Sequence, residues 1–461
     1  MRFKSTLLLA LLLVGLGLYL FLVEFPQERR KTAEEEEASR VFSFNSKEVS
    51  GLTVRYPNTE EISLTKDRDG KWRLTRPIET AASRSGVNKI IGLTDSLEFK
   101  RVAEEKPSDL HAFGLDPPQI QVTFKFPDHE EHLFVGDDAP ASSAYYIKKG
   151  EEPRVLLVDH KMGDLKHTLE EERSVKAWRK KEVADLASNK LEEIRLDYGS
   201  RTFSLAKEGN EWWVREPIRT LADRLAVNGL IQTISGLTAE DFIDDQKPQE
   251  EKKFGPPRLI ITLKGESQTQ TIKLYQPVPA NGKKGEGGFY AVSTPDEPIY
   301  VLKGRGLDDL NKNLYDLRDK LVLNNIERLA IQEIRIQNGQ DSFSMLKKGD
   351  DWRMEDQKTE ADQQKVTKLL DEVELLKAEK FVDDAPKGLS IYGLADPSRQ
   401  ISFYDKEKKL LGKLLIGKEQ EGMVYAMSGS QPGSLPERPV VLVKKAILDF
   451  INSKAEFAKK S

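Results

Sequence analysis

Alternating apolar and polar residues recur near the beginning of the sequence. Runs of this kind have the period of a half-buried strand, in which every second side chain faces the core. Asp69-Gly70 lies between the second and third runs, and this dipeptide favours a tight hairpin turn. We therefore predict a meander of three antiparallel strands. The apolar positions of the three runs are Leu52, Val54 and Tyr56, then Ile62 and Leu64, then Trp72 and Leu74.

An apolar stripe with helical spacing follows this meander, and the stripe occurs three times in the chain. A residue that can cap a helix stands four positions before each stripe, at Ser83, Asp223 and Asp362. Residues three or four positions apart line one side of a helix. We predict three helices whose stripes lie in the core rather than on a partner-binding face. The stripes consist of Val87, Ile90, Ile91 and Leu97, of Val227, Leu230, Ile231, Ile234 and Leu237, and of Val366, Leu369, Leu370, Val373 and Leu376.

A turn and four further strand-like runs follow each helix. The turn joins an aromatic residue to glycine ahead of proline, at Phe113-Gly114, Phe254-Gly255 and Tyr392-Gly393. Glycine permits a positive φ, and proline prevents a helix from continuing. A short apolar helix closes the pattern, so each copy reads β-β-β-α-β-β-β-β-α. This order predicts an α+β fold with mainly antiparallel strands.

The whole pattern is repeated in tandem. Trp72, Trp213 and Trp352 follow one another at nearly equal intervals, and each stands at nearly the same distance before the glycine of its turn. Such periodicity indicates a repeat architecture, and we expect the three tryptophans to occupy equivalent places. We assign α+β repeats to residues 41–181, 182–320 and 321–461.

The links between the repeats are short and resemble one another. Trp178-Arg179-Lys180-Lys181 and Leu317-Arg318-Asp319-Lys320 superpose when the sequence is shifted by one repeat, and the first strand of the next repeat follows each. The third repeat has no such counterpart at its end. Because short connections hold neighbouring elements close together, we expect adjacent repeats to be in contact.

An unbroken apolar segment, Leu7–Val23, precedes the repeats. At about 1.5 Å per residue in a helix it spans roughly 26 Å, close to the thickness of a bilayer's hydrocarbon core. The flank after Val23 lacks the small-residue pattern of a signal-peptide cleavage site, so we expect an uncleaved anchor, with a removed signal peptide as the alternative. We assign residues 1–5 to a short basic head, 6–25 to a transmembrane helix and 26–40 to a charged linker.

The orientation of this anchor is harder to predict. Basic residues stand on both sides of it, Arg2 and Lys4 before and Arg29, Arg30 and Lys31 after, so the positive-inside count is nearly balanced. A first apolar segment with a short basic head usually leaves its amino end in the cytoplasm. We therefore expect a single-pass protein of the cytoplasmic (inner) membrane, with the bulk of the chain on the extracytoplasmic side.

Composition excludes several kinds of function. The formal net charge of −4 argues against a nucleic-acid partner, which usually requires a basic face. The sequence contains no cysteine, so disulfides, thiolate metal sites and cysteine nucleophiles are ruled out. The turn glycines do not belong to a phosphate loop, because no G-x-x-x-x-G-K motif follows a strand and opens a helix.

Histidines and paired carboxylates are the remaining candidates for chemistry. His129 and His132 are three residues apart in an expected turn, whereas a helical zinc pair is spaced by four, so we interpret them as part of a solvated hairpin. Asp137-Asp138 and Asp383-Asp384 have no base or nucleophile at a recognisable spacing, and we interpret them as surface charge. We therefore assign no catalytic, cofactor-binding or metal-binding residue. All five histidines lie in the first repeat: His111, His129, His132, His160 and His167.

These motifs together resemble the bacterial domain-of-unknown-function family 4340. The similarity lies in the tryptophan hairpin, the turn Phe113–Pro117, the strand end Val135-Gly136 and the tyrosine-containing strand, behind an amino-terminal anchor. It covers nearly all of residues 41–459 in three copies. The second copy departs from the pattern by losing Leu-Asp from its turn and by carrying a Gly-rich insertion at residues 281–285. The resemblance implies that the protein is associated with ABC transport systems of the gliding-motility-associated type, and it implies no catalytic residue.

Two classes of function remain open. The first is a non-enzymatic binding or scaffold protein, anchored in the membrane, whose partner is a protein such as an ABC transporter subunit. The second is an extracytoplasmic hydrolase with a site between repeats. If the chain is a hydrolase, we expect one repeat to contain a polar pocket with shifted pKa values that the other repeats lack. If it is a scaffold, we expect equivalent apolar cores and an exposed interface.

Overall fold

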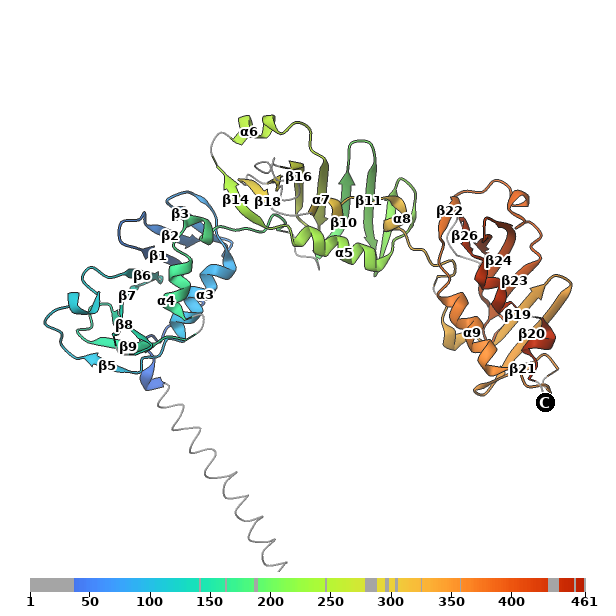
Figure 1. Cartoon of the computed structure of the whole chain (residues 1–461), viewed down its shortest axis with the longest axis horizontal. Helices are drawn as coiled ribbons and strands as arrows, with labels where there is room; N and C mark the ends of the chain where they lie inside the picture. The colour runs from blue at the N-terminus through green and yellow to red at the C-terminus, as the bar shows by residue number, and fades with distance from the viewer. Residues whose placement is uncertain are drawn as a thin grey trace, which may run out of the picture. The chain divides into compact units, whose positions relative to one another are not determined.

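A computed structural model describes residues 37–459, except for 141, 162–163, 186–189, 245–246, 278–287, 295–297, 303–305, 325, 357, 430–438 and 452. The expected anchor, most of the expected linker and the Gly-rich insertion lie outside the described residues. Within the described part of the chain, no helix is both long enough and apolar enough to cross a membrane. The described residues form three antiparallel sheets, each accompanied by helices (Figure 1).

The first sheet has nine strands in the order β4-β3-β2-β1-β6-β7-β8-β9-β5, and neighbouring strands run antiparallel. The long helix α3 packs beside α4 (Figure 1). The strands are β1 (Gly51–Arg55), β2 (Ile62–Lys66), β3 (Trp72–Arg76), β4 (Thr80–Ala81), β5 (Arg101–Glu104), β6 (Ile120–Lys125), β7 (Glu130–Asp138), β8 (Ala144–Lys149) and β9 (Val155–Asp159). The helices are α3 (Arg84–Asp95), η2 (His111–Phe113), α4 (Leu165–Glu171) and η3 (Val175–Trp178).

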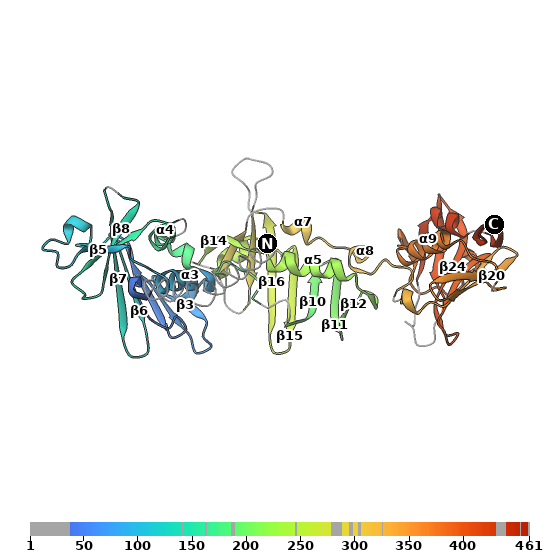
Figure 2. The same ribbon diagram turned by 90° about the horizontal axis from the view of Figure 1, so that it is seen from below.

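The second sheet repeats this order as β13-β12-β11-β10-β15-β16-β17-β18-β14. Its long helix α5 lies across β10 to β12 (Figure 2). The strands are β10 (Leu191–Asp197), β11 (Thr202–Glu208), β12 (Glu211–Glu216), β13 (Thr220–Leu221), β14 (Ala239–Ile243), β15 (Leu259–Gly265), β16 (Thr269–Pro277), β17 (Phe289–Ser293) and β18 (Ile299–Leu302). The helices are α5 (Arg224–Ser235), α6 (Lys247–Lys253), α7 (Gly306–Asp309) and α8 (Leu314–Leu317).

The third sheet has eight strands in the order β21-β20-β19-β23-β24-β25-β26-β22. It keeps the same strand order except that an isolated bridge between Arg353 and Glu360 replaces the two-residue strand of the other sheets, and α9 packs beside β21. The strands are β19 (Glu333–Asn338), β20 (Asp341–Lys348), β21 (Asp351–Met354), β22 (Lys380–Asp383), β23 (Arg399–Tyr404), β24 (Leu410–Gln420), β25 (Met423–Ser428) and β26 (Val440–Lys444). The helices are η5 (Arg328–Ala330), α9 (Gln363–Glu374), η6 (Ser390–Tyr392), η7 (Lys445–Phe450) and α10 (Lys454–Phe457).

The three long helices confirm the predicted caps and stripes, except that Ile231 of the second stripe is only half-buried. The Ser83 hydroxyl accepts a hydrogen bond from the Gly86 N–H at 3.1 Å, and the carboxylates of Asp223 and Asp362 accept from backbone N–H groups in the first turns of α5 and α9. Such caps satisfy donors that have no partner within the helix. The stripe residues buried by the three helices are Val87, Ile90 and Ile91, then Val227, Leu230 and Ile234, then Val366, Leu369, Leu370 and Val373.

One expected equivalence is wrong, because Trp212 and not Trp213 matches Trp72 and Trp352. The backbone carbonyls of these three tryptophans accept equivalent hydrogen bonds from an alanine N–H in the residues before the long helix. Trp212 is buried like its two counterparts. Successive residues of a strand face opposite ways, so Trp213 lies on the other face of β12, where Arg219 stacks 4.4 Å from its ring centroid.

The aromatic-glycine turn and the end of the following hairpin strand form a single contact. Gly114 has φ of 65°, in the left-handed region that favours glycine. A Cβ added to Gly136, at the Val-Gly strand end, would lie only 2.2 Å from the carbonyl oxygen of Phe113. Gly417 stands in the same relation to Tyr392, at 2.1 Å. The two recurring glycine motifs therefore depend on each other.

The second repeat departs from both motifs at once. Tyr275 takes the place of Gly136, and Pro256 takes the place of the turn leucine. The side chain of Tyr275 is buried and its ring lies 5.4 Å from that of Phe254. Phe254 in turn stacks 4.1 Å from Tyr290. An aromatic side chain thus fills the space that the close approach of backbone occupies in the other repeats.

The predicted α+β class with antiparallel strands is confirmed, although two kinds of strand were missed. β4 and β13 are only two residues long, too short for a period to be seen. β5, β14 and β22 follow the long helix and pair with the last strand of their own sheet. This pairing joins segments that are far apart in the sequence, and periodicity carries no information on such distant partners.

Contacts group the chain into two compact units, and the division passes through the second repeat. The first unit combines the first repeat with residues 236–257 and 272–304, which include β14, β17 and β18. The second combines residues 186–235 and 258–271 with the remainder of the chain from residue 305. The edge that β14 and β18 form therefore groups with the repeat that precedes it.

Candidate functional site

The first junction between repeats buries an arginine. Arg179 follows η3 and is only 4% exposed. Its two terminal nitrogens donate to the Asp244 carboxylate at 2.8 and 2.7 Å, and its guanidinium carbon lies 3.8 Å from the ring centroid of Phe242 in β14. A bidentate pair fixes orientation as well as distance, and the ring adds a cation–π attraction. The join between the repeats is therefore a specific contact.

The second junction repeats this arrangement. Arg318 follows α8, is 2% exposed and donates to Asp384 at 2.7 Å. Its guanidinium carbon lies 3.5 Å from the ring centroid of Phe381 in β22. The Tyr315 hydroxyl adds a hydrogen bond to the carbonyl of Ala378 at 3.1 Å. The two junctions share the same three residue types at matching positions. The contact is therefore a recurring feature of the repeat.

Backbone hydrogen bonds show that the end of the third repeat lacks this cation. In every repeat the N-cap residue of the long helix donates its N–H to a carbonyl near the end of the repeat. The residue after that carbonyl is arginine in the first two repeats and Ala458 in the third. This difference agrees with the missing join in the sequence. The accepting carbonyls belong to Trp178, Leu317 and Phe457.

A polar cluster occurs in the first repeat. His160 lies between two carboxylates, with Nε2 3.0 Å from Asp138 and Nδ1 2.8 Å from Asp164. A neutral imidazole can donate from only one nitrogen, so this geometry requires the imidazolium to satisfy both carboxylates. The ammonium of Lys166, a residue that is 5% exposed, donates to Asp138 and to the carbonyl of Gly136.

Three neighbouring element ends bring these side chains together. Asp138 is the last residue of β7, and His160 directly follows β9. Asp164 is the N-cap of α4, where its carboxylate accepts from the N–H of His167 at 2.7 Å. Lys166 lies in the first turn of that helix. An Asp at an N-cap is common for its own helix, and here it also holds the histidine.

Both titratable partners of the cluster are shifted towards their charged forms. Burial lowers the pKa of His160, but hydrogen bonds to Asp164 and Asp138 outweigh that effect, so its pKa lies above the ordinary value. The hydrogen bond from Lys166 is the main reason that the pKa of Asp138 is lowered, and His160 contributes as well. Folding therefore favours the charged forms of both groups in the cluster.

Tyr145 in β8 lies against this network. It is fully buried, and its ring centroid is 4.9 Å from that of His160. Burial raises the pKa of Tyr145 well above its ordinary value, so the phenol is neutral. Its hydroxyl makes no hydrogen bond of good geometry within the described part of the chain, although the backbone N–H of Lys166 lies close enough to favour the phenolate. An unsatisfied buried polar group of this kind costs about 1–3 kcal/mol.

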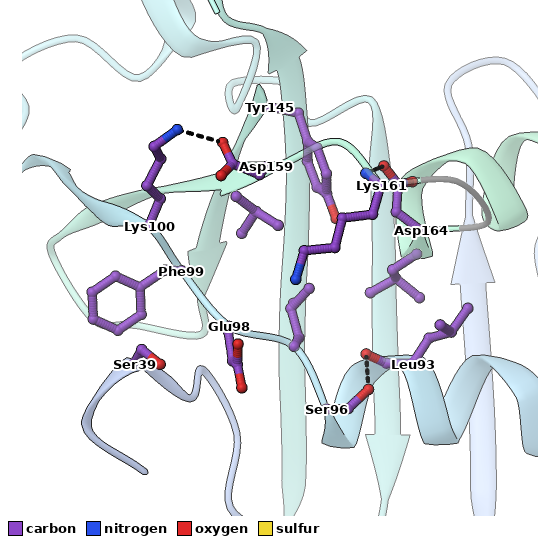
Figure 3. Close-up of a pocket in the computed structure, with 13 residues that line it drawn as sticks. Ser39, Leu93, Ser96, Glu98, Phe99, Lys100, Tyr145, Asp159, Lys161 and Asp164 are labelled. Atoms are coloured by element: carbon purple, nitrogen blue, oxygen red, sulfur yellow. Dashed lines mark hydrogen bonds and ion pairs between the residues drawn. The ribbon is translucent and has the colours of Figure 1, made fainter. Parts of the chain in front are cut away.

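A cavity of about 330 Å³ lies beside these residues (Figure 3). Glu98 and Lys100 lie on one side, Lys161 and Asp164 lie on the other, and Tyr145 stands between them (Figure 3). Its charges are mixed, and apart from Ser39 and Ser96 its remaining wall is apolar. That wall is formed by Leu93, Leu97, Phe99, Val158 and Leu165.

The model of the family described as "Domain of unknown function (DUF4340)" matches three segments, residues 72–248, 212–360 and 352–461. The chain belongs to this family. The three DUF4340 matches begin at Trp72, Trp212 and Trp352, which are equally spaced in the sequence, and this agrees with the corrected tryptophan equivalence. No curated protein matches the chain.

The polar cluster distinguishes the first DUF4340 repeat from the other two. Tyr145 faces Val158 across the hairpin, and the residues with that register are Phe289 and Val424 in the other repeats, neither of which carries a hydroxyl. At the corresponding place in the third repeat, Lys445 and Glu419 form an ion pair at 2.6 Å. A position-by-position comparison of the three repeats in the sequence could have revealed this site.

Most of the histidines and aspartates that the sequence offered as candidates for chemistry contact a nearby side chain in the structure. His129 stacks on Phe126, 4.6 Å between ring centroids, and binds Asp128 at 2.7 Å, whereas His132 belongs to β7 and binds Thr123 at 3.0 Å. No group of three or more metal-ligating side chains occurs among the residues described. Asp138 and Asp384 are more than surface charge, because each accepts a hydrogen bond from a buried cation.

Proposed function

We propose that this DUF4340 chain is a membrane-anchored extracytoplasmic binding or scaffold protein that presents three coupled modules to a protein partner. The observation that carries the proposal is the repeated arginine junction. A guanidinium that is 2–4% exposed has lost its hydration, and such a cation is stable only while its carboxylate partner stays in place. The junctions therefore couple each repeat to the edge strand of the next.

Coupling of this kind suits a partner that contacts more than one repeat. A pair of linked binding modules gains affinity when its geometry permits simultaneous engagement. Buried contacts at both junctions restrict that geometry in a way that a free linker does not. We propose an ABC transport system of the gliding-motility-associated type as the complex that is served, and this part rests on family resemblance.

The alternative, a hydrolase with a site between repeats, is favoured by one observation, the polar cluster with shifted pKa values in the first repeat. That cluster lies within a repeat rather than between two. Both ring nitrogens of His160 face carboxylates, so the imidazole offers no free lone pair for general-base catalysis. The buried phenol of Tyr145 is neutral and a poor nucleophile. The scaffold function fits these contacts better.

Purification from detergent-solubilised membranes tests the proposal. We expect the full-length chain to resist carbonate washing and to co-purify with subunits of an ABC transporter. The Asp244→Ala/Asp384→Ala variant loosens both junctions and should retain less partner. Glu216→Ala is the matched control, because its carboxylate pairs with the exposed Arg195 inside one repeat.

Each part of the proposal has its own contrary result. Wild-type eluates without any transporter subunit would contradict the assignment to a transport complex. Equal partner retention by the junction variant and the control would show that coupling between repeats does not matter. A chain that is released by carbonate, or that lacks the segment up to about position 33, would overturn the anchor.

A further inference from the structure

We propose that the exit of the second repeat is a charge-strained joint, which holds the third repeat more firmly as the pH falls below neutral. We call residues 317–320 the exit segment, because they lead from the end of α8 into the third repeat. Arg318 links the two repeats there, since its backbone bridges to Ala222 and its side chain donates to Asp384. The effect on coupling deepens the proposed scaffold role and rests on it, whereas the joint itself follows from contacts at the end of the second repeat.

Two backbone hydrogen bonds attach the exit segment to the residues before α5. The N–H of Asp223 donates to the carbonyl of Leu317 at 2.9 Å. The N–H of Asp319 donates to the carbonyl of Leu221 at 2.8 Å. The two bonds flank the bridge of Arg318, so Asp223 and Asp319 are diagonal neighbours with their side chains on the same face.

The three repeats differ at these two positions. Like charges at neighbouring positions across a bridge repel each other, whereas opposite charges attract. Within the described residues, the second repeat is the one in which this diagonal joins two acids. The equivalent backbone hydrogen bonds identify the counterparts of Asp223 and Asp319 as Ser83 and Lys180 in the first repeat and as Asp362 and Lys459 in the third.

The surroundings of Asp319 do not neutralise its charge. The side chain is half-buried and accepts a hydrogen bond from the N–H of Leu321 at 3.0 Å. The charged groups that act on it are Asp223 and Lys320. The ammonium of Lys320 lies 3.6 Å from the Asp223 carboxylate, and Asp319 forms no ion pair within the part of the chain that the structure describes. The repulsion between the two acids is therefore only partly offset.

This arrangement makes the joint sensitive to pH. Burial is the main reason that the pKa of Asp319 lies above its ordinary value, and the charge of Asp223 raises it further, against the hydrogen bond from Leu321 and the charge of Lys320. Because folding raises this pKa, stability is gained as the pH falls through the folded value, and the gain is complete below the unfolded value of about 3.9. Acidification therefore relieves the repulsion and favours the closed bridge.

The second junction is also the one with fewer hydrogen bonds to its arginine. Arg318 donates to Asp384 through one terminal nitrogen, whereas Arg179 donates to Asp244 through two. An exit segment that detached from the residues before α5 would carry Arg318 with it. The second junction is therefore the place where coupling between repeats yields first.

Hydrogen exchange of the full-length chain in detergent tests this proposal. Asp319→Asn removes the charge and keeps an acceptor for the N–H of Leu321. At about pH 7.5 it should raise the protection factors of residues 220–223 and 317–321 roughly threefold, the size expected for relief of one like-charge pair. The wild type should show a similar gain between about pH 7.5 and 4.5, and Asp319→Asn should show none.

Two other variants complete the test. Asp309→Asn, which neutralises an exposed aspartate of the same repeat, should leave these protection factors unchanged. Asp223→Ser keeps a residue that can cap α5 and should reduce the gain on acidification without abolishing it, because the burial of Asp319 remains. Equal effects of Asp319→Asn and Asp309→Asn, no gain in the wild type on acidification, or a gain that persists in Asp319→Asn would overturn the proposal. Exchange is measured without a partner, so failure to recover a transporter subunit would leave this result unaffected.

Discussion

At the first junction, removing the carboxylate of Asp244 should destabilise the protein much more than removing the guanidinium of Arg179. Asp244→Ala leaves the guanidinium of Arg179, which is 4% exposed, without a counter-ion. Breaking a fully buried ion pair in this way costs about 3–5 kcal/mol. The Asp244 side chain is 45% exposed, so solvent already screens the pair, and we expect a cost of about 2–3 kcal/mol.

Arg179→Met is the informative partner of that variant. Methionine keeps an apolar side chain against Phe242 and removes the buried charge, while the Asp244 carboxylate can return to water. We expect Arg179→Met to cost about 1 kcal/mol or less, chiefly the lost cation–π attraction. The double variant should then resemble Arg179→Met alone, because the alanine no longer strands a cation.

Hydrogen exchange of the full chain is the appropriate measurement, since a protein of several repeats need not unfold in one step. The amides of β14 and β18 report opening of the junction edge. Glu216→Ala, which breaks an exposed pair at 2.7 Å, should change those opening free energies by no more than about 0.5 kcal/mol. If Arg179→Met opened β14 as much as Asp244→Ala does, the explanation by a stranded cation would be refuted.

Two further predictions concern the first repeat. Because the pKa of His160 is raised by folding, the stabilisation from its two ion pairs is complete below the unfolded value of about 6.5 and is lost as the pH rises through the folded value. The protection factors of the α4 amides, which compare the exchange rate with the intrinsic base-catalysed rate, should fall over that window, and His160→Gln should abolish the fall. Protection factors that do not change with pH would contradict the imidazolium. Gly136→Ala should destabilise the first repeat in thermal unfolding, because its Cβ would lie 2.2 Å from a backbone oxygen. The control Gly229→Ala, a helix position with no atom within 4 Å, should be neutral or stabilising by up to about 1 kcal/mol, and equal effects of the two substitutions would argue against the close contact.

Local periodicity accounts for what could be predicted of the fold. The stripe that begins at Val87 and the alternation at Leu52 and Val54 each report on a single element, so the helices and most strands followed from them. The adjacent aromatic residues Trp212 and Trp213 both fit the alternation, and the hydrogen-bond register decides for Trp212, in agreement with its equal spacing from Trp72 and Trp352. The strand β14 was missed because its pairing depends on β18, which lies far away in the sequence.

The candidate sites were less predictable for the same physical reason. The sequence marked Arg179 as part of a recurring join, but its acceptor Asp244 lies far along the chain, beyond the long helix of the next repeat. The cluster around His160 draws on the ends of β7 and β9 and the start of α4. Nothing in the immediate neighbourhood of Asp138 indicates that a buried lysine donates to it. Polar side chains that come together from distant parts of the chain show no periodicity in the sequence, so a pattern cannot reveal them.

The dependence between the turn and the strand end constrains how these repeats can exchange segments. Tandem copies invite unequal recombination, and a crossover between Gly114 and Gly136 would join the turn of one copy to the strand of another. A chain that combined the turn of the first repeat with Tyr275 would place an aromatic ring where backbone already approaches closely. A crossover inside this segment would therefore destabilise the product, whereas an exchange that carries turn and strand together would keep the contact intact.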